Sequence, residues 1–593
     1  MRIDKKVWRP LFFLFSYIVF VPIINEYLKV LEKCFQISFN TLDINFFNLI
    51  VVVFKNGTIF TIWLLLDFII VLTIKNVILT KENLKIEVEG IRLKKKDGTF
   101  GTADWGTKEE IMEYLSIGKR DGIILGETEE KEIITLPINT YLNKNIAVFG
   151  SSGSGKSVGF AIPNGMELAQ EELQKAINKE MSIVYTDPKG ELYRKLAKYL
   201  MSKGYDVKVF NLVNPIFSHG CKFINFIEDE TDAQIFSQIV IENTQLDRKS
   251  SGDEFWNRGE QNLLKALLLY VINYVKDVED KNLGFIYDCL ASGNIKEIDN
   301  IFFDTEGPTK LSYNIYAQAT DIVKQSIVTG LATRLQIFQT DKIRNLTNKD
   351  EINFENIGKR KTCIFTITSD TNSTFDFLST LFFSFLFIKL IKSADANLDG
   401  RLKVETSLIL DEFTNIGRIV DFEKKLATTR SRGINIFMIF QNIAQLKNRY
   451  DNDVWQEILR ELRYENLHAD VGDILTASYI TEYLGVATVE TSAVRKEAGF
   501  DGNFTYGMEN VATNKRNLMN PDELLKMDNT KEIVMVRGRK PFICNKYAYM
   551  RHADYEKLEN ISTEEQMELF KENIYQNDVK QQHKKVKYSF KDF

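Results

Sequence analysis

The sequence predicts an α/β core with an inserted all-helical domain and, ahead of both, an N-terminal hairpin of two transmembrane helices. From residue 145 onward, short apolar runs typical of buried parallel strands alternate with helical segments. Between about 226 and 345 the sequence is helical in pattern, without strand-like runs. Two apolar stretches also lie before residue 80.

Length and charge limit the classes of protein that fit. At 593 residues the chain exceeds the usual size of one hydrophobic core, so two or three domains are expected. The formal charge is −5, so the protein is not coated with basic charge, and any DNA contact must be local. The five cysteines lack CxxC spacing and do not cluster with the four histidines. This pattern indicates reduced thiols and no structural metal.

The two N-terminal apolar stretches are residues 11–24 and 58–74. The first follows a basic head, as a secretory signal does, but no small-residue cleavage site accompanies it. A helix needs about 20 apolar residues to span a bilayer, so the second must extend upstream or tolerate Asp67. Basic residues flank the pair, which predicts a multi-pass protein of the cytoplasmic membrane with everything after residue 80 in the cytoplasm. The alternative is two core helices of a soluble domain.

A glycine-rich loop follows an apolar run in residues 145–157, NIAVFGSSGSGKS, and matches the Walker A pattern between a strand and a helix. Glycines let the backbone wrap around phosphates and aim amide groups at them. Lys156 would add positive charge at the β and γ phosphates, and Ser157 would ligate Mg²⁺. The helix after the loop is expected to run to about residue 178. The predicted ATP-binding residues here are Gly150, Ser151, Ser152, Gly153, Ser154, Gly155, Lys156 and Ser157.

A second strand, SLILDE at 407–412, ends in two carboxylates. Asp411 would hold the Mg²⁺ through water, and Glu412 would act as general base toward the attacking water. Alone, this segment is equally compatible with an ordinary acidic strand end, but a Walker A loop requires such a strand. Together the two motifs predict a RecA-like P-loop NTPase that uses ATP and Mg²⁺.

Three further positions are catalytic candidates by placement. Gln441 follows the apolar strand 434–440, where its amide would contact the γ-phosphate or the water. Arg430 and Arg432 lie between the two strands, and one of them would reach a neighbouring subunit's nucleotide. The alternatives are a polar residue that ends a strand and a solvated basic turn.

With these motifs assembled, the chain resembles the type IV coupling proteins of the TraG/TraD-like family, which are hexameric membrane ATPases of conjugation and type IV secretion. The segment DPKGELY is, by its residues alone, a strand-to-helix turn. The resemblance implies that Asp187 and Lys189 of this segment belong to the nucleotide site. Five blocks carry the resemblance: GTADWGT (101–107), GSSGSGKS (150–157), DPKGELY (187–193), LILDEFTNIG (408–417) running into TTRSRGINIFMIFQNIAQL (428–446), and NLMNPDELLKMDNTKEIVMVRGRKPF (517–542).

The resemblance also implies an inserted all-helical domain, and apolar residues at three- and four-residue spacing in EFWNRGEQNLLKALLLYVINYV fit it. The core resumes at the strand KTCIFTI, 361–367. The expected parts are a transmembrane hairpin (1–80), the first part of the nucleotide-binding domain (81–225), the all-α domain (226–345), the second part (346–553) and a charged tail (554–593).

Two regions differ from the family pattern or add to it. LRYENLHADVGDILTASYI at 462–480 replaces an NCD-like tripeptide, so no role is carried over to that strand. The tail becomes basic at KQQHKKVKYSF, 580–590. It is either a solvated end or a flexible arm that touches DNA or lipid.

The resemblance implies an ATP-driven translocase that works as a homo-hexamer. Its partners would be single-stranded DNA with covalently attached relaxase, the type IV secretion channel proteins and the membrane. One alternative is an FtsK-like translocase of double-stranded DNA, which would need four spans or a winged-helix tail. The other is a nucleotide-switched receptor that docks protein effectors. The presence of Glu412 and Gln441 argues against pure switching, but not against protein cargo.

Overall fold

The computed structural model describes residues 98–140, 143–244, 254–369, 375–462, 464–468, 471–498 and 504–575, with a few isolated positions before residue 98. It comprises two units. The smaller contains residues up to 94 together with 489–514, and the larger contains 95–488 together with 515–593. Apart from isolated positions, the predicted transmembrane stretches 11–24 and 58–74 lie outside the described residues.

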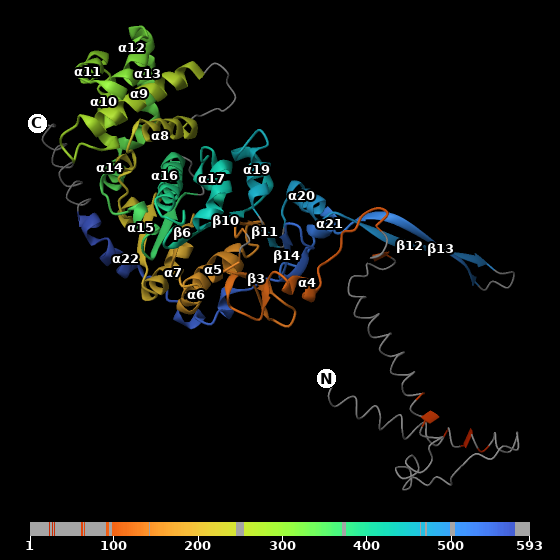
Figure 1. The fold of residues 1–593 in the computed structure, drawn as a ribbon. Helices are drawn as coiled ribbons and strands as arrows, with labels where there is room; N and C mark the ends of the chain where they lie inside the picture. Colours follow the sequence, from red (N-terminus) through yellow and green to blue (C-terminus); the bar gives the residue numbers. More distant parts are fainter. Residues whose placement is uncertain are drawn as a thin grey trace, which may run out of the picture. The chain divides into compact units, whose positions relative to one another are not determined.

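A twelve-stranded sheet forms the centre of the larger unit as far as it is described, in the order β2-β4-β3-β15-β14-β11-β5-β10-β9-β6-β8-β7 (Figure 1). Its strands are β2 Ser116–Ile117, β3 Gly122–Glu127, β4 Ile133–Pro137, β5 Ile146–Phe149, β6 Met181–Thr186, β7 Asp206–Asn211, β8 Thr362–Ile367, β9 Glu405–Leu410, β10 Ile434–Phe440, β11 Tyr464–His468, β14 Lys531–Val536 and β15 Phe542–Asn545.

The half of the sheet from β11 to β7 is parallel, and the half from β14 to β2 is antiparallel. Every residue of β5, β6, β9 and β10 is buried, as expected for parallel strands with both faces covered. The α/β fold with a parallel sheet predicted from the apolar runs is therefore confirmed. Since the strands run in one direction, their carboxyl ends meet at one edge of the sheet.

Helices cover the sheet (Figure 1). The α-helices of this core are α4 Lys108–Met112, α5 Ile162–Leu168, α6 Glu171–Ala176, α7 Glu191–Ser202, α15 Phe354–Ile357, α16 Asp376–Asp395, α17 Phe422–Thr429, α18 Ile443–Arg449, α19 Val454–Glu461, α20 Ile474–Leu484, α21 Pro521–Leu524 and α22 Thr563–Leu569.

The helix after the glycine-rich loop differs from the single helix expected to about residue 178. It begins as a π-helical turn, η2 Ser157–Ala161, continues as α5, and breaks at Gln170 before α6. Pro163 has no N–H to donate to the carbonyl of Gly159, so an α-helical bond cannot form there. Gln170 has extended backbone angles, which end the helix.

A helical cluster follows the first part of the core, and between 226 and 345 the described residues form no strand. Its interior is aromatic: the rings of Phe302 and Tyr313 stack with centroids 4.4 Å apart, and Tyr270 meets Phe302 edge-on at 5.8 Å. The helices of this cluster are α8 Glu230–Asn243, α9 Glu254–Asn273, α10 Leu283–Ala291, α11 Ile295–Ile301, α12 Gly307–Ala317, α13 Asp321–Arg334 and α14 Asp341–Asn348.

Among the described residues, α16 is long and apolar enough to cross a membrane, but 78% of its most apolar window is buried inside the protein. Phe382 on this helix stacks on Phe210 of β7 at 4.9 Å, and Phe385 packs on Phe226 at 5.9 Å. The helix therefore belongs to the hydrophobic core.

The smaller unit contains a three-stranded sheet that the sequence did not predict. Its strands are β1 Ile91–Leu93, β12 Val486–Ala498 and β13 Phe504–Asn517, in the order β1-β12-β13. β1 pairs antiparallel with β12, with Ile91 opposite Thr491. The strand after the second apolar stretch is thus paired with a hairpin that belongs to the distant C-terminal half.

The segment 554–575, expected as the start of a charged tail, packs on the rest of the larger unit. The Ile561 amide donates to the carbonyl of Arg194 at 2.9 Å. Phe570, 4% exposed, meets the rings of Phe217 and His219 edge-on. The basic stretch 580–590 lies outside the described residues.

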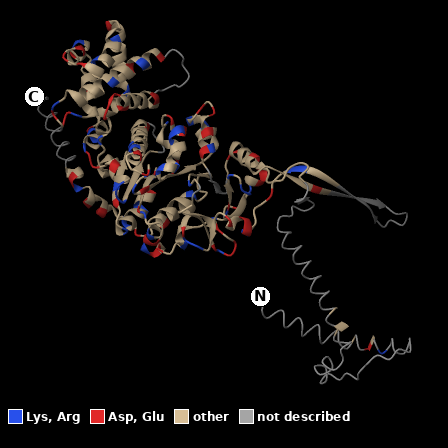
Figure 2. Cartoon of the chain, in the orientation of Figure 1, with Lys and Arg blue, Asp and Glu red and all other residues tan. Residues whose placement is uncertain are grey.

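Basic and acidic side chains are interspersed over the described chain, as Figure 2 shows. This distribution agrees with a small net charge of −5. Such a mixed distribution does not indicate a general surface for binding polyanions such as DNA.

Gly165 on α5 tests how tightly the core packs beside the glycine-rich loop. A Cβ at this position would lie 1.7 Å from Oη of the buried Tyr185. We expect Gly165→Ala to lower the free energy of unfolding by about 1–3 kcal/mol although alanine favours helices, because overpacking outweighs propensity.

Urea unfolding checks this, and Gly165→Ala combined with Tyr185→Phe is the matched control. Removing Oη leaves Cζ at 3.1 Å as the nearest atom of that ring, so the double variant should recover part of the loss. Equal stability of wild type and Gly165→Ala would contradict the packing described here.

Candidate active site

A cavity of about 240 Å³ lies at the carboxyl ends of the parallel strands. It is bounded by the loop after β5, the turn after β6 and the end of β9. Nine of the predicted site residues line it: Ser152, Gly153, Gly155, Lys156, Ser157, Asp187, Lys189, Asp411 and Glu412. Gly150, Ser151, Ser154, Gln441, Arg430 and Arg432 are not among its lining residues.

The glycine-rich loop has the backbone shape that close approach to a ligand requires. Gly153 and Gly155 both have φ of +86°, in the left-handed region, and no atom lies within 4 Å of a Cβ built on either. Lys156 is 7% exposed. Its ammonium donates to the carbonyls of Gly150 at 2.6 Å and Ser151 at 2.7 Å. Lys156 therefore folds back over the loop and lines the cavity.

Ser157 and Asp411 meet although 254 positions separate them. The Ser157 hydroxyl donates to Oδ2 of Asp411 at 3.0 Å, and the Thr186 hydroxyl donates to the Asp411 carbonyl at 2.6 Å. Burial raises the pKa of Asp411, and the Ser157 hydroxyl opposes that shift. Hydroxyl and carboxylate oxygens are hard ligands, which suit Mg²⁺.

Glu412 is held by amides on both oxygens of its carboxylate. Gln441 Nε2 donates to Oε1 at 2.8 Å, and Asn415 Nδ2 donates to Oε2 at 2.9 Å. Glu412 itself has φ of +49°, an unfavourable angle for a non-glycine residue that is typical of functional sites. Gln445 donates in turn to Oε1 of Gln441 at 3.4 Å.

Asp187 is buried at the start of α7, where its carboxylate accepts the Tyr193 amide at 2.8 Å. Burial raises the pKa of Asp187 to about 6, and the backbone amides at the helix start limit the rise. Lys189, two residues on, is exposed and lines the cavity. The turn after β6 thus adds one buried acid and one exposed cation.

The two arginines lie together in the short helix η8 Arg430–Arg432, away from the lining of this cavity. Arg432 makes a two-pronged ion pair with Asp395, at 2.8 and 3.1 Å, and donates to the carbonyl of Thr428. Arg430 is exposed at the C-terminal end of α17.

Sequence reasoning missed Asn415 and Gln445. Asn415 follows Glu412 by three residues in the short helix η7 Phe413–Ile416, whose turn brings the amide back to the carboxylate. Gln445 likewise follows Gln441 by four residues across the start of α18. Amides three or four residues after each candidate were an available signal.

The residues present fit a magnesium nucleotide. The open glycines leave room for phosphate oxygens, Lys156 supplies positive charge, and Ser157 with Asp411 supplies metal ligands. Within the described parts of the chain, no group of three or more His, Cys, Asp or Glu side chains could hold a metal by itself. Mg²⁺ does not require such a group, because it keeps waters and takes substrate phosphates as ligands.

A family profile described as "Type IV secretory system Conjugative DNA transfer" matches residues 95–588. The chain belongs to this family. It is a type IV secretion coupling protein, as the five sequence blocks predicted.

Curated relatives agree with the family. This coupling protein is 22% identical over 495 residues to "Conjugal transfer protein TraG" of Agrobacterium fabrum (strain C58 / ATCC 33970), covering 78% of this chain and 72% of the relative. It is 22% identical over 462 residues to "Protein VirD4" of Rhizobium radiobacter, covering 76% of this chain and 64% of the relative.

The fold is that of a solved coupling protein. The "Bacterial conjugative coupling protein TrwBdeltaN70" in its unbound form superimposes with a TM-score of 0.52 at 16% identity, over 76% of this chain and 96% of that one. Plasmid coupling protein TrwB in complex with ADP and Mg²⁺ gives 0.51 at 16% identity, over 76% and 97%. The RecA-like fold is therefore confirmed.

Membership of this family assigns the coupling protein to conjugative DNA transfer through a type IV secretion system. It also makes the protein membrane-associated. How many times the chain crosses the membrane rests on the sequence expectation alone.

The raised pKa of Asp187 predicts a pH-dependent stability. Its pKa is about 6 when folded against 3.8 ordinarily, so the unfolded chain loses this proton first as pH rises. The contribution of Asp187 to folding is therefore most favourable below about pH 4 and is lost as pH rises through 6. We expect Asp187→Asn, which keeps an acceptor for Tyr193, to stabilise the nucleotide-free protein by about 1–3 kcal/mol at pH 8.

Urea unfolding between pH 4 and pH 8 measures this difference. The gain should shrink as pH falls toward 4, because folded Asp187 is then protonated and the unfolded chain is close to its own pKa of 3.8. Asp277→Asn, at an exposed loop position, is the control and should show no such trend. Stability curves of wild type and Asp187→Asn that run parallel over this range would refute the assigned shift.

Proposed function

We propose that this coupling protein binds ATP with Mg²⁺ and hydrolyses it to drive single-stranded DNA, with covalently attached relaxase, into the type IV secretion channel. The observation that carries the proposal is the single cavity lined by the P-loop, the Ser157–Asp411 pair and Glu412. A phosphate clamp, metal ligands and a general base are thereby within reach of one another.

Each side chain has a separate task. Lys156 and the loop amides bind the β and γ phosphates, and Ser157 and Asp411 hold the metal ion. Bound Mg²⁺ supplies charge neutralisation at the β and γ phosphates. Lys189 is exposed at the cavity wall, where its charge favours a polyanionic ligand.

Glu412 is the general base. Its carboxylate takes the proton of the attacking water, and the amides of Gln441 and Asn415 fix the carboxylate orientation. Because each amide donates to a different oxygen, the carboxylate is held in one orientation. The presence of this complete set supports hydrolysis rather than a nucleotide-binding switch without turnover.

Known relatives support the choice of ligand and cargo. TrwB, which shares the fold, has been solved with ADP and Mg²⁺ and with a non-hydrolysable ATP analogue. The matched family is named for conjugative DNA transfer. Single-stranded DNA would be gripped mainly through its phosphates, which gives sequence-tolerant and salt-dependent binding.

Residues 11–24 and 58–74 form the proposed two-span anchor, which leaves the motor in the cytoplasm. We propose a homo-hexamer, because Arg430 and Arg432 are not among the lining residues of their own chain's cavity. Arg432 would first have to leave Asp395 in order to act on a neighbour. Arg430 is exposed at the end of α17, and we assign the action in trans to it as the first candidate.

The first test is ATP hydrolysis by the full-length protein in detergent, with and without single-stranded DNA. We expect turnover that DNA stimulates. Lys156→Ala should reduce turnover by about 100-fold or more, because it removes the positive charge at the phosphates. Glu412→Gln should reduce turnover by about 100-fold, because it removes the general base. Glu412→Gln should still bind nucleotide, since the glutamine keeps the shape of the side chain.

The outcomes separate the candidate functions. Stimulation by double-stranded DNA alone would favour an FtsK-like translocase over the proposed motor. Lys156-dependent turnover that ignores DNA but responds to a secreted protein would favour the effector-docking receptor. If Lys156→Ala left turnover unchanged, the assignment of this cavity as the hydrolytic site would be wrong.

The arginine in trans is tested by mixing inactive subunits. Arg430→Ala alone should lose about 1,000-fold in turnover, the lower range for an arginine finger. Mixed with Lys156→Ala subunits it should regain activity, because one variant offers the intact P-loop and the other the intact arginine. Arg432→Ala mixed in the same way is the comparison. Recovery only in the mixture with Arg432→Ala would assign the role to Arg432. Recovery in neither mixture would exclude both arginines.

A further inference from the structure

Lys546, immediately after β15, reaches the glycine-rich loop from the far end of the sequence. Its ammonium donates to the carbonyl of Ser154 at 2.5 Å and to Oδ1 of Asn529 at 2.8 Å. The contact spans 392 positions. A charge-assisted hydrogen bond of this kind is stronger than one between neutral groups.

The lysine is itself firmly held. Its backbone amide donates to the carbonyl of Thr530 at 3.0 Å, and Asp528 accepts the amide of Thr530 at 2.8 Å. The side chain therefore starts from a turn built on the antiparallel half of the sheet, from which it extends to the loop.

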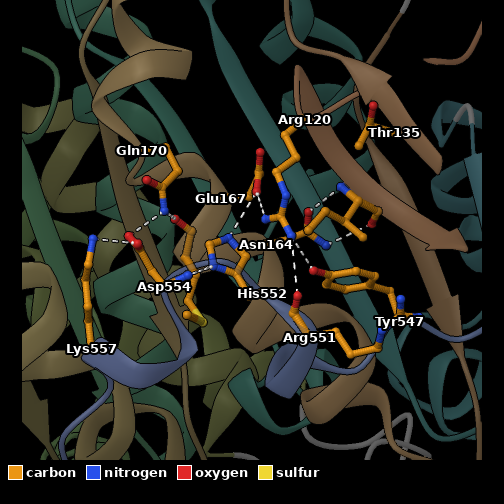
Figure 3. Close-up of polar contacts among 12 residues, drawn as sticks. Arg120, Thr135, Asn164, Glu167, Gln170, Tyr547, Arg551, His552, Asp554 and Lys557 are labelled. Carbon is orange, nitrogen blue, oxygen red and sulfur yellow. Dashed lines mark hydrogen bonds and ion pairs between the residues drawn. The ribbon is translucent and has the colours of Figure 1, made fainter. Parts of the chain in front are cut away.

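Residues 546–554, here termed the C-terminal strap, are fixed again beyond the loop. His552 Nδ1 accepts the Asp554 amide at 3.1 Å, so Nε2 carries the proton and donates to Oε2 of Glu167 at 3.0 Å (Figure 3). Arg120 donates to the same oxygen at 3.2 Å. Glu167 lies on α5, the continuation of the P-loop helix, and it and His552 are buried.

A further bond joins the strap to the end of that helix. Gln170 Nε2 donates to Oδ2 of Asp554 at 2.9 Å (Figure 3). The strap therefore contacts the P-loop segment at the loop itself, near the end of α5 and at the break before α6. The strap is therefore held at both ends, at Lys546 and at His552 and Asp554.

Peptide geometry gives the contact at Ser154 a direct consequence. The described chain has no cis peptide bond, so the Ser154 carbonyl and the Gly155 N–H point to opposite sides of one planar unit. Ser154 is 1% exposed and is absent from the cavity lining, whereas Gly155 lines the cavity. Holding the carbonyl on the buried side therefore turns the Gly155 amide toward the cavity.

The loop needs such an anchor. Gly153 and Gly155 flank Ser154, and neither has a side chain or a neighbour within 4 Å of its Cβ position. Glycine loses more backbone entropy on ordering than any other residue, so two of them make this peptide easy to rotate. A fixed cation on the intervening carbonyl limits that rotation.

We propose that Lys546 is a positioning residue of the nucleotide site, which orients the Gly155 amide toward a bound phosphate by holding the Ser154 carbonyl. This inference rests on the proposed binding of nucleotide. It assigns a role in that site to the C-terminal strap, which lies outside the P-loop, the DPKGE turn and the acidic strand.

The test is the Kd of a fluorescent non-hydrolysable ATP analogue with Mg²⁺, measured on full-length Lys546→Met. We expect the Kd to rise about 10-fold, the lower end for loss of a hydrogen bond to a charged group. The Tm should stay within about 3 °C of wild type, since methionine keeps the apolar stem. Lys546→Arg keeps the cation and should restore the Kd to within about 3-fold of wild type.

Lys531→Met is the matched control, because Lys531 on neighbouring β14 pairs with Glu129 and not with the loop. Its Kd should equal that of wild type. An unchanged Kd in Lys546→Met overturns the inference, as does an equal rise in Lys531→Met. Lys156→Ala separates the two proposals: if it binds the analogue as well as wild type, the proposed nucleotide site fails, whatever Lys546 does.

Discussion

The parallel pairing of β5, β10, β9 and β6 is the constraint on which the site depends. In the register of these strands Phe149 lies beside Phe440, and Leu410 lies beside both Met438 and Thr186. The residue immediately after each of these four strands is either a proposed site residue or the first residue of the glycine-rich loop. A one-residue slip of any strand would send its side chains to the other face of the sheet and separate groups that now meet.

This constraint also concentrates charge. Asp187 and Asp411 directly follow adjacent strands. Asp187 is buried and Asp411 half-buried, and burial raises the pKa of both. Buried carboxylates reduce stability unless cations or donors accompany them. Such placement is expected where a protein gives up some stability to prepare a site for a charged ligand.

The strands and the Walker A loop were predictable because each is written in consecutive residues. Apolar runs located β5, β6, β9 and β10, and the glycine spacing located the loop. The break at Gln170 was not predicted, since the local pattern gave a continuous helix. Pro163 was visible, but one proline in a first turn does not forbid a helix.

The rest depended on tertiary structure. The hairpin β12–β13 and its pairing with β1 bring together residues about 400 positions apart, for which a single sequence carries no signal. For Lys546, nothing near it in the sequence distinguishes it from any other lysine. The arginines remain between two interpretations, because a single chain does not contain the neighbour on which one of them would act.

The strap has a consequence for how the protein is made. During synthesis the P-loop emerges long before residues 546–554, so for most of translation α5 exists without its final contacts. Glu167 then lacks the imidazole of His552, so a carboxylate that becomes buried is without one of its hydrogen-bond donors. The proposed nucleotide site therefore lacks its contacts with the strap until almost the whole chain has left the ribosome.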